Sequence, residues 1–542
     1  MNRKFALQKI PIPLPAAGVL ALTFLYCMLG LVGHAPWKTE DAVGAGIVFQ
    51  MLTADHLSSW LVPRLAGELY LEDGPLFYVL AAICAKILSP VLALHDGARL
   101  ASALSLGATI WLCRAATIEF FGRQEGDSAA LMLIGCLGLF VHAHMLDSEN
   151  GALAGSALAW YGLALAFRSN PRAPWVFAAG LLLVFLTKGL PPMLPLLVAA
   201  FTAPLLGQQW RTRRYVIATL IALAITATGV ASWLAALGAT GSHSISAWWL
   251  LQHDFHASLA PERIREQVQL LSWATWPLWP VALWALWDRR RRLTSDPCLV
   301  ITMGVLTGLA LFLVTRNVSE ILAKPVMIPL AILAGAGFTQ LRRGAANAMS
   351  WFGAMTFTIL GGLVWLGWIA MMTGVPEQVA NNFAKLEPGH VPRFDSVGFA
   401  MAAALTLIWL ALIARGARSP LKGAPVWAVG VTLVWGLVMS LWVHWIDYGK
   451  TYEPVALSLK AAIPADTRCI SSRNLGEAQR AALHYHAGIV TQRLEINPRS
   501  RCDAILIQGI ASRPDRLDAG WHRVWEGSRP RERERFRLYV RD

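Results

Sequence analysis

Long apolar runs recur from the N-terminus to about residue 443, and short polar segments separate them. A helix needs about 20 residues to cross a bilayer core of about 30 Å, and most of these runs approach that length. The pattern therefore predicts a polytopic α-helical membrane protein with about thirteen transmembrane helices. They are expected at residues 14–33, 100–118, 128–146, 151–167, 174–187, 190–206, 216–240, 271–287, 297–315, 325–341, 349–372, 396–414 and 424–443.

One further apolar stretch, PLFYVLAAICAKILSPVLAL at residues 75–94, is not counted as a crossing. It contains Lys86 and Pro90, and a cation near the middle of a bilayer is costly. We expect this stretch to lie in or near the outer membrane interface. The N-terminus then lies inside and the C-terminus outside.

The distribution of basic residues agrees with this topology. The segments expected inside, with the N-terminus, carry 18 Lys and Arg, whereas the outer segments before the tail carry 11 over about twice the length. Such a bias is typical of bacterial multi-pass membrane proteins. The first helix lacks a small-residue cleavage site, so we interpret it as an uncleaved anchor.

Composition supports the same class. Of the 542 residues, 56% are hydrophobic and only 15% are charged, which is too apolar for an ordinary soluble protein. The net charge of +14 could suggest a nucleic-acid partner, but the topology and the tail account for most of the Lys and Arg. We expect no nucleic-acid partner.

The apolar pattern stops after residue 445, so the chain divides into a transmembrane domain, 1–445, and a tail, 446–542. Strand-like runs (TRCISS, CDAILIQG, RFRLYV) and a helix-like run (GEAQRAALHYHAG) predict a small α/β domain on the outer face. Cys469 and Cys502 lie in this tail, and spacing leaves their pairing open. The basic end, SRPRERERFRLYVRD, is either a solvated charge run or a contact for anionic lipid.

Ionisable residues gather at the outer ends of helices and in the first outer loop, residues 34–98, rather than in the middle of helices. Together, carboxylates and cations at one membrane face could deprotonate an acceptor hydroxyl and hold a phosphate. Each residue alone is also explained as a solvated loop charge. No Walker loop and no G-x-G-x-x-G after a strand mark a nucleotide site. The gathered residues are Glu40, Asp41, Arg64, Glu68, Glu72, Asp73, Asp147, Glu149 and Lys188.

These motifs resemble the GT-C membrane glycosyltransferases, in the bacterial branch that includes the lipid A aminoarabinose transferases and the protein O-mannosyltransferase-like proteins. The resemblance covers the transmembrane part in order. It rests on WKTEDAVGAGIVFQML, WLVPRLAGELYLEDGPLFY, HMLDSENGALAG, FLTKGLPPMLP and TWPLWPVALWALW. It implies a GT-C fold with interfacial helices in the outer loops, and a polyprenyl-phosphate-linked sugar as donor. No nucleotide sugar is then needed at the outer face of the inner membrane.

The resemblance also implies roles for residues of the first loop. The family's acidic pair is usually Asp then Glu, whereas this chain has Glu40 then Asp41, and either could be the catalytic carboxylate that meets the acceptor. Arg64 and Tyr70 fit the Pro-Arg-Leu-x-Gly-x-x-Tyr pattern, and Arg64 is expected to clamp a phosphate through its fork. Asp73 stands where many members have the lysine of a Lys-Pro-Pro-Leu motif, so another cation must supply the positive charge of that lysine.

Further substrate-binding residues follow from the same resemblance. The missing charge is expected from Lys86, Lys188 or Lys324, of which Lys188 matches the family's Thr-Lys-Gly turn and is otherwise explained as a snorkelling lysine. Asn150 stands where an Asp is common, with Glu149 and Asp147 nearby. His253 and His256 are candidates near the donor. No further ligands accompany this histidine pair, so a divalent metal is not indicated and no cofactor besides the donor is expected.

The sequence thus predicts an inverting glycosyltransferase of the bacterial inner membrane, with a cytoplasmic N-terminus and a periplasmic C-terminal domain. Its acceptor would be lipid A, a glycan or a protein, and it would act as a monomer among membrane lipids. A non-catalytic relative that binds a lipid-linked sugar or scaffolds an envelope complex is the alternative. A transporter ranks last, because it predicts paired charges near the bilayer midplane and related halves.

Overall fold

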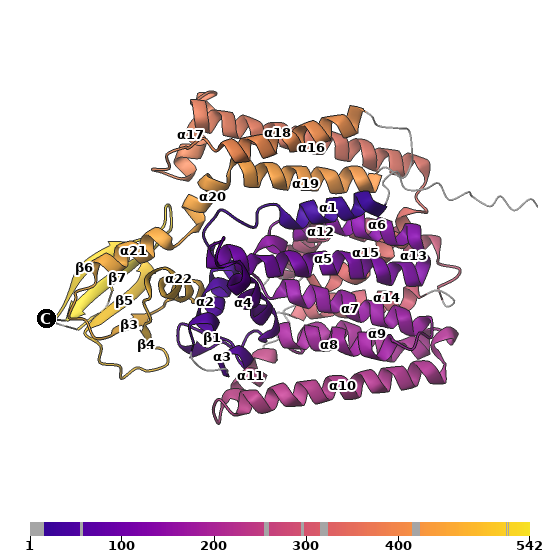
Figure 1. Ribbon diagram of the computed structural model, residues 1–542, viewed down its shortest axis with the longest axis horizontal. Helices are drawn as coiled ribbons and strands as arrows, with labels where there is room; N and C mark the ends of the chain where they lie inside the picture. Colours follow the sequence, from indigo (N-terminus) through magenta and orange to yellow (C-terminus); the bar gives the residue numbers. More distant parts are fainter. Residues whose placement is uncertain are drawn as a thin grey trace, which may run out of the picture.

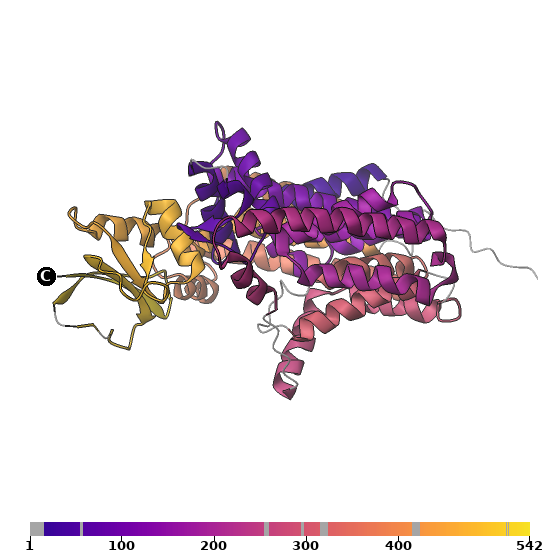
Figure 2. The same ribbon diagram turned by 90° about the horizontal axis from the view of Figure 1, so that it is seen from below.

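The computed structural model describes residues 16–54, 58–253, 260–293, 297–314, 324–414, 423–515, 517–518 and 520–541. Its helices run along the long axis of the molecule, and a small domain with a β-sheet stands at one end of them (Figure 1). The view turned by 90° shows the same two parts end to end (Figure 2). The described chain is therefore mostly helical with a small C-terminal sheet domain, as the sequence predicts.

The helices of the bundle follow the apolar runs. Where the surroundings are apolar, a helix satisfies its backbone N–H and C=O groups within the segment itself. They are α1 (Ala16–Met28), α5 (Leu94–Phe121), α6 (Arg123–Ile134), α7 (Glu149–Phe167), α8 (Ala173–Lys188), α9 (Leu194–Leu206), α10 (Arg213–Gly238), α13 (Leu278–Asp288), α14 (Cys298–Val314), α15 (Lys324–Phe338), α16 (Arg343–Thr373), α18 (Ser396–Ala414) and α19 (Gly423–Leu441).

Five helices among the described residues, α5, α10, α16, α18 and α19, are long and apolar enough to cross a membrane by length and composition. A sixth arises if α6 and the bent segment Leu137–His144 count as one span. Shorter apolar helices, including α1, α8, α14 and α15, lie among them. The protein is thus a multi-pass helical membrane protein, and the number of thirteen crossings stays a prediction.

Two of the predicted continuous helices are wrong. The one expected at 271–287 is divided, because α12 (Pro261–Ala274) ends before Pro277 and α13 begins after it, and proline supplies no N–H to continue a helix. The one expected at 128–146 ends as α6 at Ile134 and continues as two short 3-10 turns, η1 (Leu137–Leu139) and η2 (His142–His144), bent by 56°. The Gly135 carbonyl at this break accepts a hydrogen bond from Trp427 Nε1 at 2.8 Å.

Several short elements gather at the end of the bundle that faces the sheet domain. They are α2 (Glu40–Thr53), α3 (Ser58–Leu61), the hairpin of β1 (Arg64–Leu65) and β2 (Glu68–Leu69), α4 (Leu76–Leu88) and α11 (Ser244–Gln252) (Figure 1). Helix α4 has 13 residues, so it is about 20 Å long and shorter than a bilayer core. Because α1 and α9 also have 13 residues, this length does not decide whether 75–94 crosses, and that expectation stays a prediction.

The remaining helices are η3 (Pro191–Met193), η4 (Gln208–Trp210), α17 (Glu377–Leu386), α20 (Val443–Lys450), α21 (Glu453–Ala462) and α22 (Glu477–Ala487). The C-terminal sheet has the order β4-β3-β5-β7-β6, formed by β3 (Ile470–Arg473), β4 (Gln492–Arg493), β5 (Ala504–Ile510), β6 (Trp521–Gly527) and β7 (Glu534–Arg541). Strand β3 pairs in parallel with β4 and β5, whereas β7 is antiparallel to β5 and β6. A disulfide joins Cys469 to Cys502, so the pairing that spacing left open is present.

The sheet domain is packed against the first-loop elements rather than hanging free. Apolar side chains of α2, α4, α21, α22, β5 and β7 form one shared core. Gly46 of α2 lies so near α22 that an added Cβ would come within 2.8 Å of the Ala481 Cβ. Glu68 also pairs with Arg480 at 2.7 Å and with Arg493 at 3.1 Å. This contact places α22 over the end of the bundle, where the candidate site lies.

Candidate functional site

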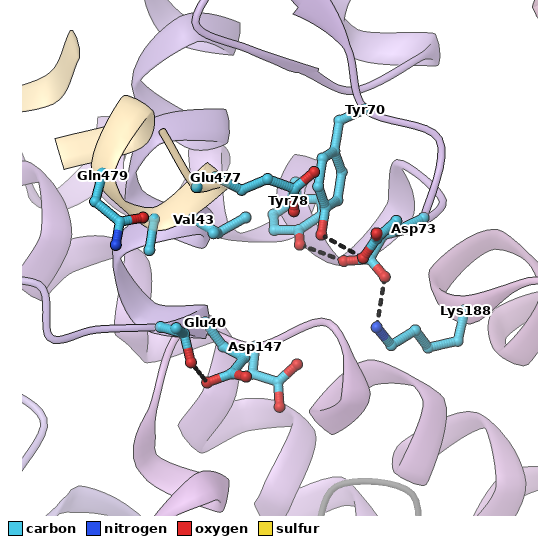
Figure 3. Close-up of a pocket in the computed structure, with 13 residues that line it drawn as sticks. Glu40, Val43, Tyr70, Asp73, Tyr78, Asp147, Lys188, Glu477 and Gln479 are labelled. Atoms are coloured by element: carbon cyan, nitrogen blue, oxygen red, sulfur yellow. Dashed lines mark hydrogen bonds and ion pairs between the residues drawn. The ribbon is translucent and has the colours of Figure 1, made fainter. Parts of the chain in front are cut away.

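A pocket of about 330 Å³ lies between the first-loop elements, the ends of the bundle helices and helix α22 (Figure 3). Its polar lining is predominantly acidic. The residues that line it are Thr39, Glu40, Val43, Tyr70, Glu72, Asp73, Tyr78, Asp147, Lys188, Gly476, Glu477, Ala478 and Gln479. Segments separated by more than 400 positions in the chain thus form one pocket.

Glu40 is the first residue of α2, and its carboxylate faces this pocket. Its Oε2 accepts a hydrogen bond from the Thr39 hydroxyl at 2.8 Å. The N-terminus of a helix favours a negative charge, so the position suits an ionised carboxylate. Glu40 is partly exposed and lines the pocket, so its carboxylate can be reached from the cavity.

Asp41 has a different environment, although it is the next residue. Its side chain is 1% exposed and forms two bonds with Arg99, from Nη2 at 2.7 Å and from Nε at 3.1 Å. The backbone N–H groups of Trp37 and Leu146 also donate to it, each at 2.9 Å. Burial alone would raise the pKa of Asp41, but the Arg99 guanidinium outweighs burial and lowers the pKa from 3.8 to about 2. Asp41 holds the loop, α2 and α5 together and does not line the pocket.

Asp73 and Lys188 form the second charged feature of the pocket. Lys188 Nζ lies 2.6 Å from Asp73 Oδ1, and the Tyr78 hydroxyl donates to Asp73 Oδ2 at 2.6 Å (Figure 3). Gly74 N donates to Thr187 O at 2.9 Å, and an added Cβ at Gly74 would collide with the Leu186 carbonyl oxygen. Glycine is therefore required for the Asp73 loop to approach the end of α8. Asp73 stands where the sequence resemblance leads one to expect a lysine, and it pairs instead with Lys188 of α8.

Asp147 and Glu149, before and at the start of α7, extend this charged network into the bundle. Asp147 Oδ2 accepts a bond from Lys324 Nζ at 2.8 Å, and both side chains are at least 96% buried. Glu149 Oε1 lies 3.7 Å from Lys188 Nζ. Asp147 lines the pocket, whereas Lys324 supports it from behind. A buried pair of this kind holds the Asp147 side chain in one orientation.

The C-terminal domain completes the pocket through α22. Glu477 is at its N-terminus, and burial together with the nearby Glu72 carboxylate raises its pKa to about 7. Burial and the charge of Asp73 raise the pKa of Glu72 as well. With a pKa of about 7, the Glu477 carboxyl is still partly protonated near neutral pH, so it can donate as well as accept hydrogen bonds.

Several predicted site residues lie elsewhere. Arg64 does not line the pocket, and its Nη1 donates to Gly67 O at 3.2 Å. Lys86 is exposed on α4, and His253 is exposed, with its Nδ1 2.9 Å from Trp249 O. Asn150 is 1% exposed and donates to the carbonyls of its own loop. His256 falls outside the described residues.

Conversely, the sequence did not single out Tyr78, Glu477 and Gln479 of the pocket or Arg99 behind it. Tyr78 ends the motif WLVPRLAGELYLEDGPLFY, but no role was assigned to it, and Arg99 lies in a helix with no local motif. Glu477 and Gln479 belong to the tail, and nothing in their own segment indicates that α22 folds back onto α2. A single signal was available, the acidic N-terminus of the helix GEAQRAALHYHAG.

No group of three or more His, Cys, Asp and Glu side chains that could hold a metal ion occurs in the described part of the chain. Among the charged residues that line the pocket, Lys188 pairs with Asp73, whereas Glu40 and Glu72 accept hydrogen bonds from the Thr39 and Tyr70 hydroxyls. The lining therefore presents carboxylates and one lysine to the cavity.

No protein-family model and no curated protein matches this sequence. Solved structures do match its shape. ArnT from Cupriavidus metallidurans bound to undecaprenyl phosphate aligns with a TM-score of 0.68 at 15% identity, over 96% of each chain. The apo state of the same protein gives 0.65 at 14% identity, again over 96% of each. The chain has a GT-C fold.

A more distant structure has the same GT-C fold. The archaeal oligosaccharyltransferase AglB from Archaeoglobus fulgidus, in complex with an inhibitory peptide and a dolichol-phosphate, aligns at a TM-score of 0.51. The identity is 10%, over 88% of this chain and 64% of AglB. The fold resemblance inferred from the sequence motifs is therefore confirmed. At these identities the likeness concerns the fold, and the activity has to be argued from the pocket.

Proposed function

We propose that this protein is a glycosyltransferase that moves a sugar from a polyprenyl-phosphate donor to an acceptor in the cell envelope. The observation that carries the proposal is the pocket at the end of a GT-C fold, where Glu40 faces the cavity and Lys188 provides a cation. The ArnT structure with undecaprenyl phosphate and the AglB structure with dolichol-phosphate support a lipid-linked donor.

In the proposed reaction the acceptor oxygen attacks the anomeric carbon while the bond from that carbon to the phosphate oxygen breaks. Glu40 orients the acceptor and takes its proton, and the lipid phosphate leaves with the bonding electron pair. Attack opposite to the leaving group inverts the anomeric configuration. If the acceptor is itself an ionised phosphate, Glu40 has no proton to take and only positions it.

In this proposal Lys188 is the cation that binds the donor phosphate, the role for which the sequence offered Lys86, Lys188 or Lys324. Negative charge grows on the departing phosphate, and a fixed cation stabilises that charge most when its position is set beforehand. Asp73 and Glu149 hold the Lys188 ammonium at 2.6 and 3.7 Å, so they act as positioning residues. Arg64 has no part in this proposal, because it does not line the pocket.

We place the pocket in the periplasm of a bacterium whose inner membrane holds the helices. The excess of basic residues in the segments expected inside supports this orientation. The disulfide of the C-terminal domain supports it too, since disulfides persist in oxidising compartments. Lipid A, a glycan or a protein is the proposed acceptor class, and the protein acts as a monomer with no cofactor, so transfer should continue in EDTA.

The test is transfer of labelled sugar from undecaprenyl-phosphate donors to envelope extracts by the purified protein. Glu40→Gln should lower transfer by at least about a hundredfold without loss of donor binding. Glu377→Gln, on the exposed helix α17, removes the same charge away from the pocket and serves as the matched control. Full transfer by Glu40→Gln would show that the catalytic assignment is wrong.

One observation favours a second candidate, a protein that binds a lipid-linked sugar without transferring it. Five carboxylates of Glu40, Glu72, Asp73, Asp147 and Glu477 line the pocket, whereas Lys188 is the sole cation among its described lining residues. Such an acidic pocket favours a sugar rich in hydroxyl or amino donors over a bare phosphate. Donor binding with no transfer to any envelope acceptor would establish this function instead.

A further inference from the structure

A second polar pocket, of about 310 Å³, lies between the C-terminal domain and the helical bundle, and the proposed reaction does not use it. Its walls come from the turn between β6 and β7, from α20 and α21, and from the segment after α17. It is lined by Pro388, Tyr448, Thr451, Pro454, Val455, Ser528, Arg529, Pro530, Arg531 and Arg535. Three arginines therefore converge on one cavity.

Arg529 forms part of the wall of this pocket, where its guanidinium is held by neighbouring groups. Its side chain is 5% exposed, and its Nη2 and Nε donate to Glu532 at 2.7 and 3.2 Å. Its Nη1 donates to Gly449 O at 3.0 Å, and its guanidinium lies 4.4 Å from the centre of the Tyr452 ring. These contacts fix the β6–β7 turn against α20, so the cavity is preformed.

Arg531 and Arg535 supply the charge that Glu532 does not neutralise. Arg531 is exposed and makes no ion pair within 4 Å among the described residues, and Arg535 Nη1 donates to the Ser528 hydroxyl. The Glu387 carboxylate lies near Arg531 and Arg529, and burial raises its pKa although these arginines lower it. Two carboxylates, Glu387 and Glu532, thus stand near three arginines.

Apolar side chains are exposed beside the pocket, in the segments that flank α17. Within α17, Phe383 packs against Trp442 and Trp445, with ring centres 5.1 and 5.0 Å apart. The Tyr448 hydroxyl donates to Pro388 O at 3.1 Å, which ties the segment after α17 to the pocket wall. Large apolar side chains are exposed on both sides of this segment, at Val375, Leu386, Val391, Phe394 and Val397.

We propose that this pocket binds the phosphate of an anionic lipid, with Arg531 and Arg535 on the phosphate oxygens and the acyl chains along the exposed side chains of Leu386, Val391 and Phe394. Arginine forks match the oxygens of a phosphate, and charge-assisted bonds of this kind are the strong ones. Basic groups at the edge of an apolar surface are typical of headgroup recognition. A free phosphate ion has the same chemistry and is distinguished by the test below.

The experiment uses the full chain in detergent and measures retained ligand by native mass spectrometry. The probes are dioctanoyl phosphatidic acid, dioctanoyl phosphatidylcholine and inorganic phosphate. We expect the phosphatidic acid to bind at least about tenfold more tightly than the phosphatidylcholine, and the double variant Arg531→Gln/Arg535→Gln to lose about tenfold in affinity. The control Arg513→Gln/Arg533→Gln removes the same charge from exposed positions of the same domain and should bind as the wild type does.

The outcomes separate the alternatives. Competition by inorganic phosphate at millimolar concentration supports the arginine site, and a gain in affinity from the acyl chains identifies the ligand as a lipid. Equal binding of inorganic phosphate and phosphatidic acid would instead identify a free phosphate. Equal affinity in the two double variants, each with an unchanged melting temperature, would overturn the proposal. Sugar transfer is not measured, so failure here leaves the proposed function intact.

Discussion

The two adjacent carboxylates of the first outer loop should respond in opposite ways to the loss of their charge. Asp41→Asn leaves the Arg99 guanidinium buried without its main partner, and breaking a buried pair typically costs about 3–5 kcal/mol. The pKa of Asp41 gives a second figure. A fall from 3.8 to about 2 corresponds to about 2 kcal/mol of stability at neutral pH, as the net effect of burial, of Arg99 and of the bond from Leu146.

Glu40→Gln removes a partly exposed charge whose bond to Thr39 a Gln oxygen can also accept. Changes of this kind usually stay within about 0.5 kcal/mol. We therefore expect Asp41→Asn to lower the apparent melting temperature by about 5 °C or more, and Glu40→Gln to leave it unchanged. Transfer should show the reverse order per folded molecule, with the larger loss in Glu40→Gln.

The assay is thermal unfolding of the purified variants in one detergent at one scan rate, followed by transfer measured at a temperature where both are folded. The pH dependence provides an internal check. Because the pKa of Asp41 is lowered by folding, its contribution is complete above about pH 4 and is lost as the pH falls towards 2. The wild type should therefore lose its advantage over Asp41→Asn in that range.

Two results would refute this division of roles. One is an equal fall in melting temperature for both variants, which would mean that Glu40 also stabilises the loop. The other is an Asp41→Asn variant that melts like the wild type but no longer transfers sugar, which would place Asp41 in the chemistry.

Three further changes test other parts of the site. Lys188→Met should lower transfer by about a hundredfold, whereas Lys385→Met on exposed α17 should not, as measured in the same transfer assay. Folding raises the pKa of Glu477 to about 7, so the stability of the wild type falls as the pH rises from about 4.5 to 7. In thermal unfolding, Glu477→Gln should therefore be more stable than the wild type by about 1 kcal/mol at pH 8 and equally stable at pH 4. Glu68→Gln leaves Arg480, which is 4% exposed, without a carboxylate and should accelerate release of the C-terminal domain by trypsin.

The positions of the bundle helices could be predicted because hydrophobic length and period are local properties of a segment. The tail was recognised for the same reason, since its strands and α22 follow alternation and helical spacing within a few residues. The breaks at Gly135 and Pro277 were missed, because the apolar pattern continues across them. Their polar groups are satisfied by distant partners, such as Trp427 for Gly135 and Leu137 N for the Trp276 carbonyl.

By itself, then, the sequence determined a helical membrane protein with charged outer loops, a small α/β tail and motifs that resemble the GT-C family. Only the tertiary structure decided which carboxylate faces the pocket. Asp41 is occupied by Arg99, 58 positions away, and by Leu146 N, 105 positions away. Asp73 meets Lys188 across 115 positions, and Glu477 arrives from the tail. Burial and charge pairing arise from contacts between distant segments, and no local pattern encodes those contacts.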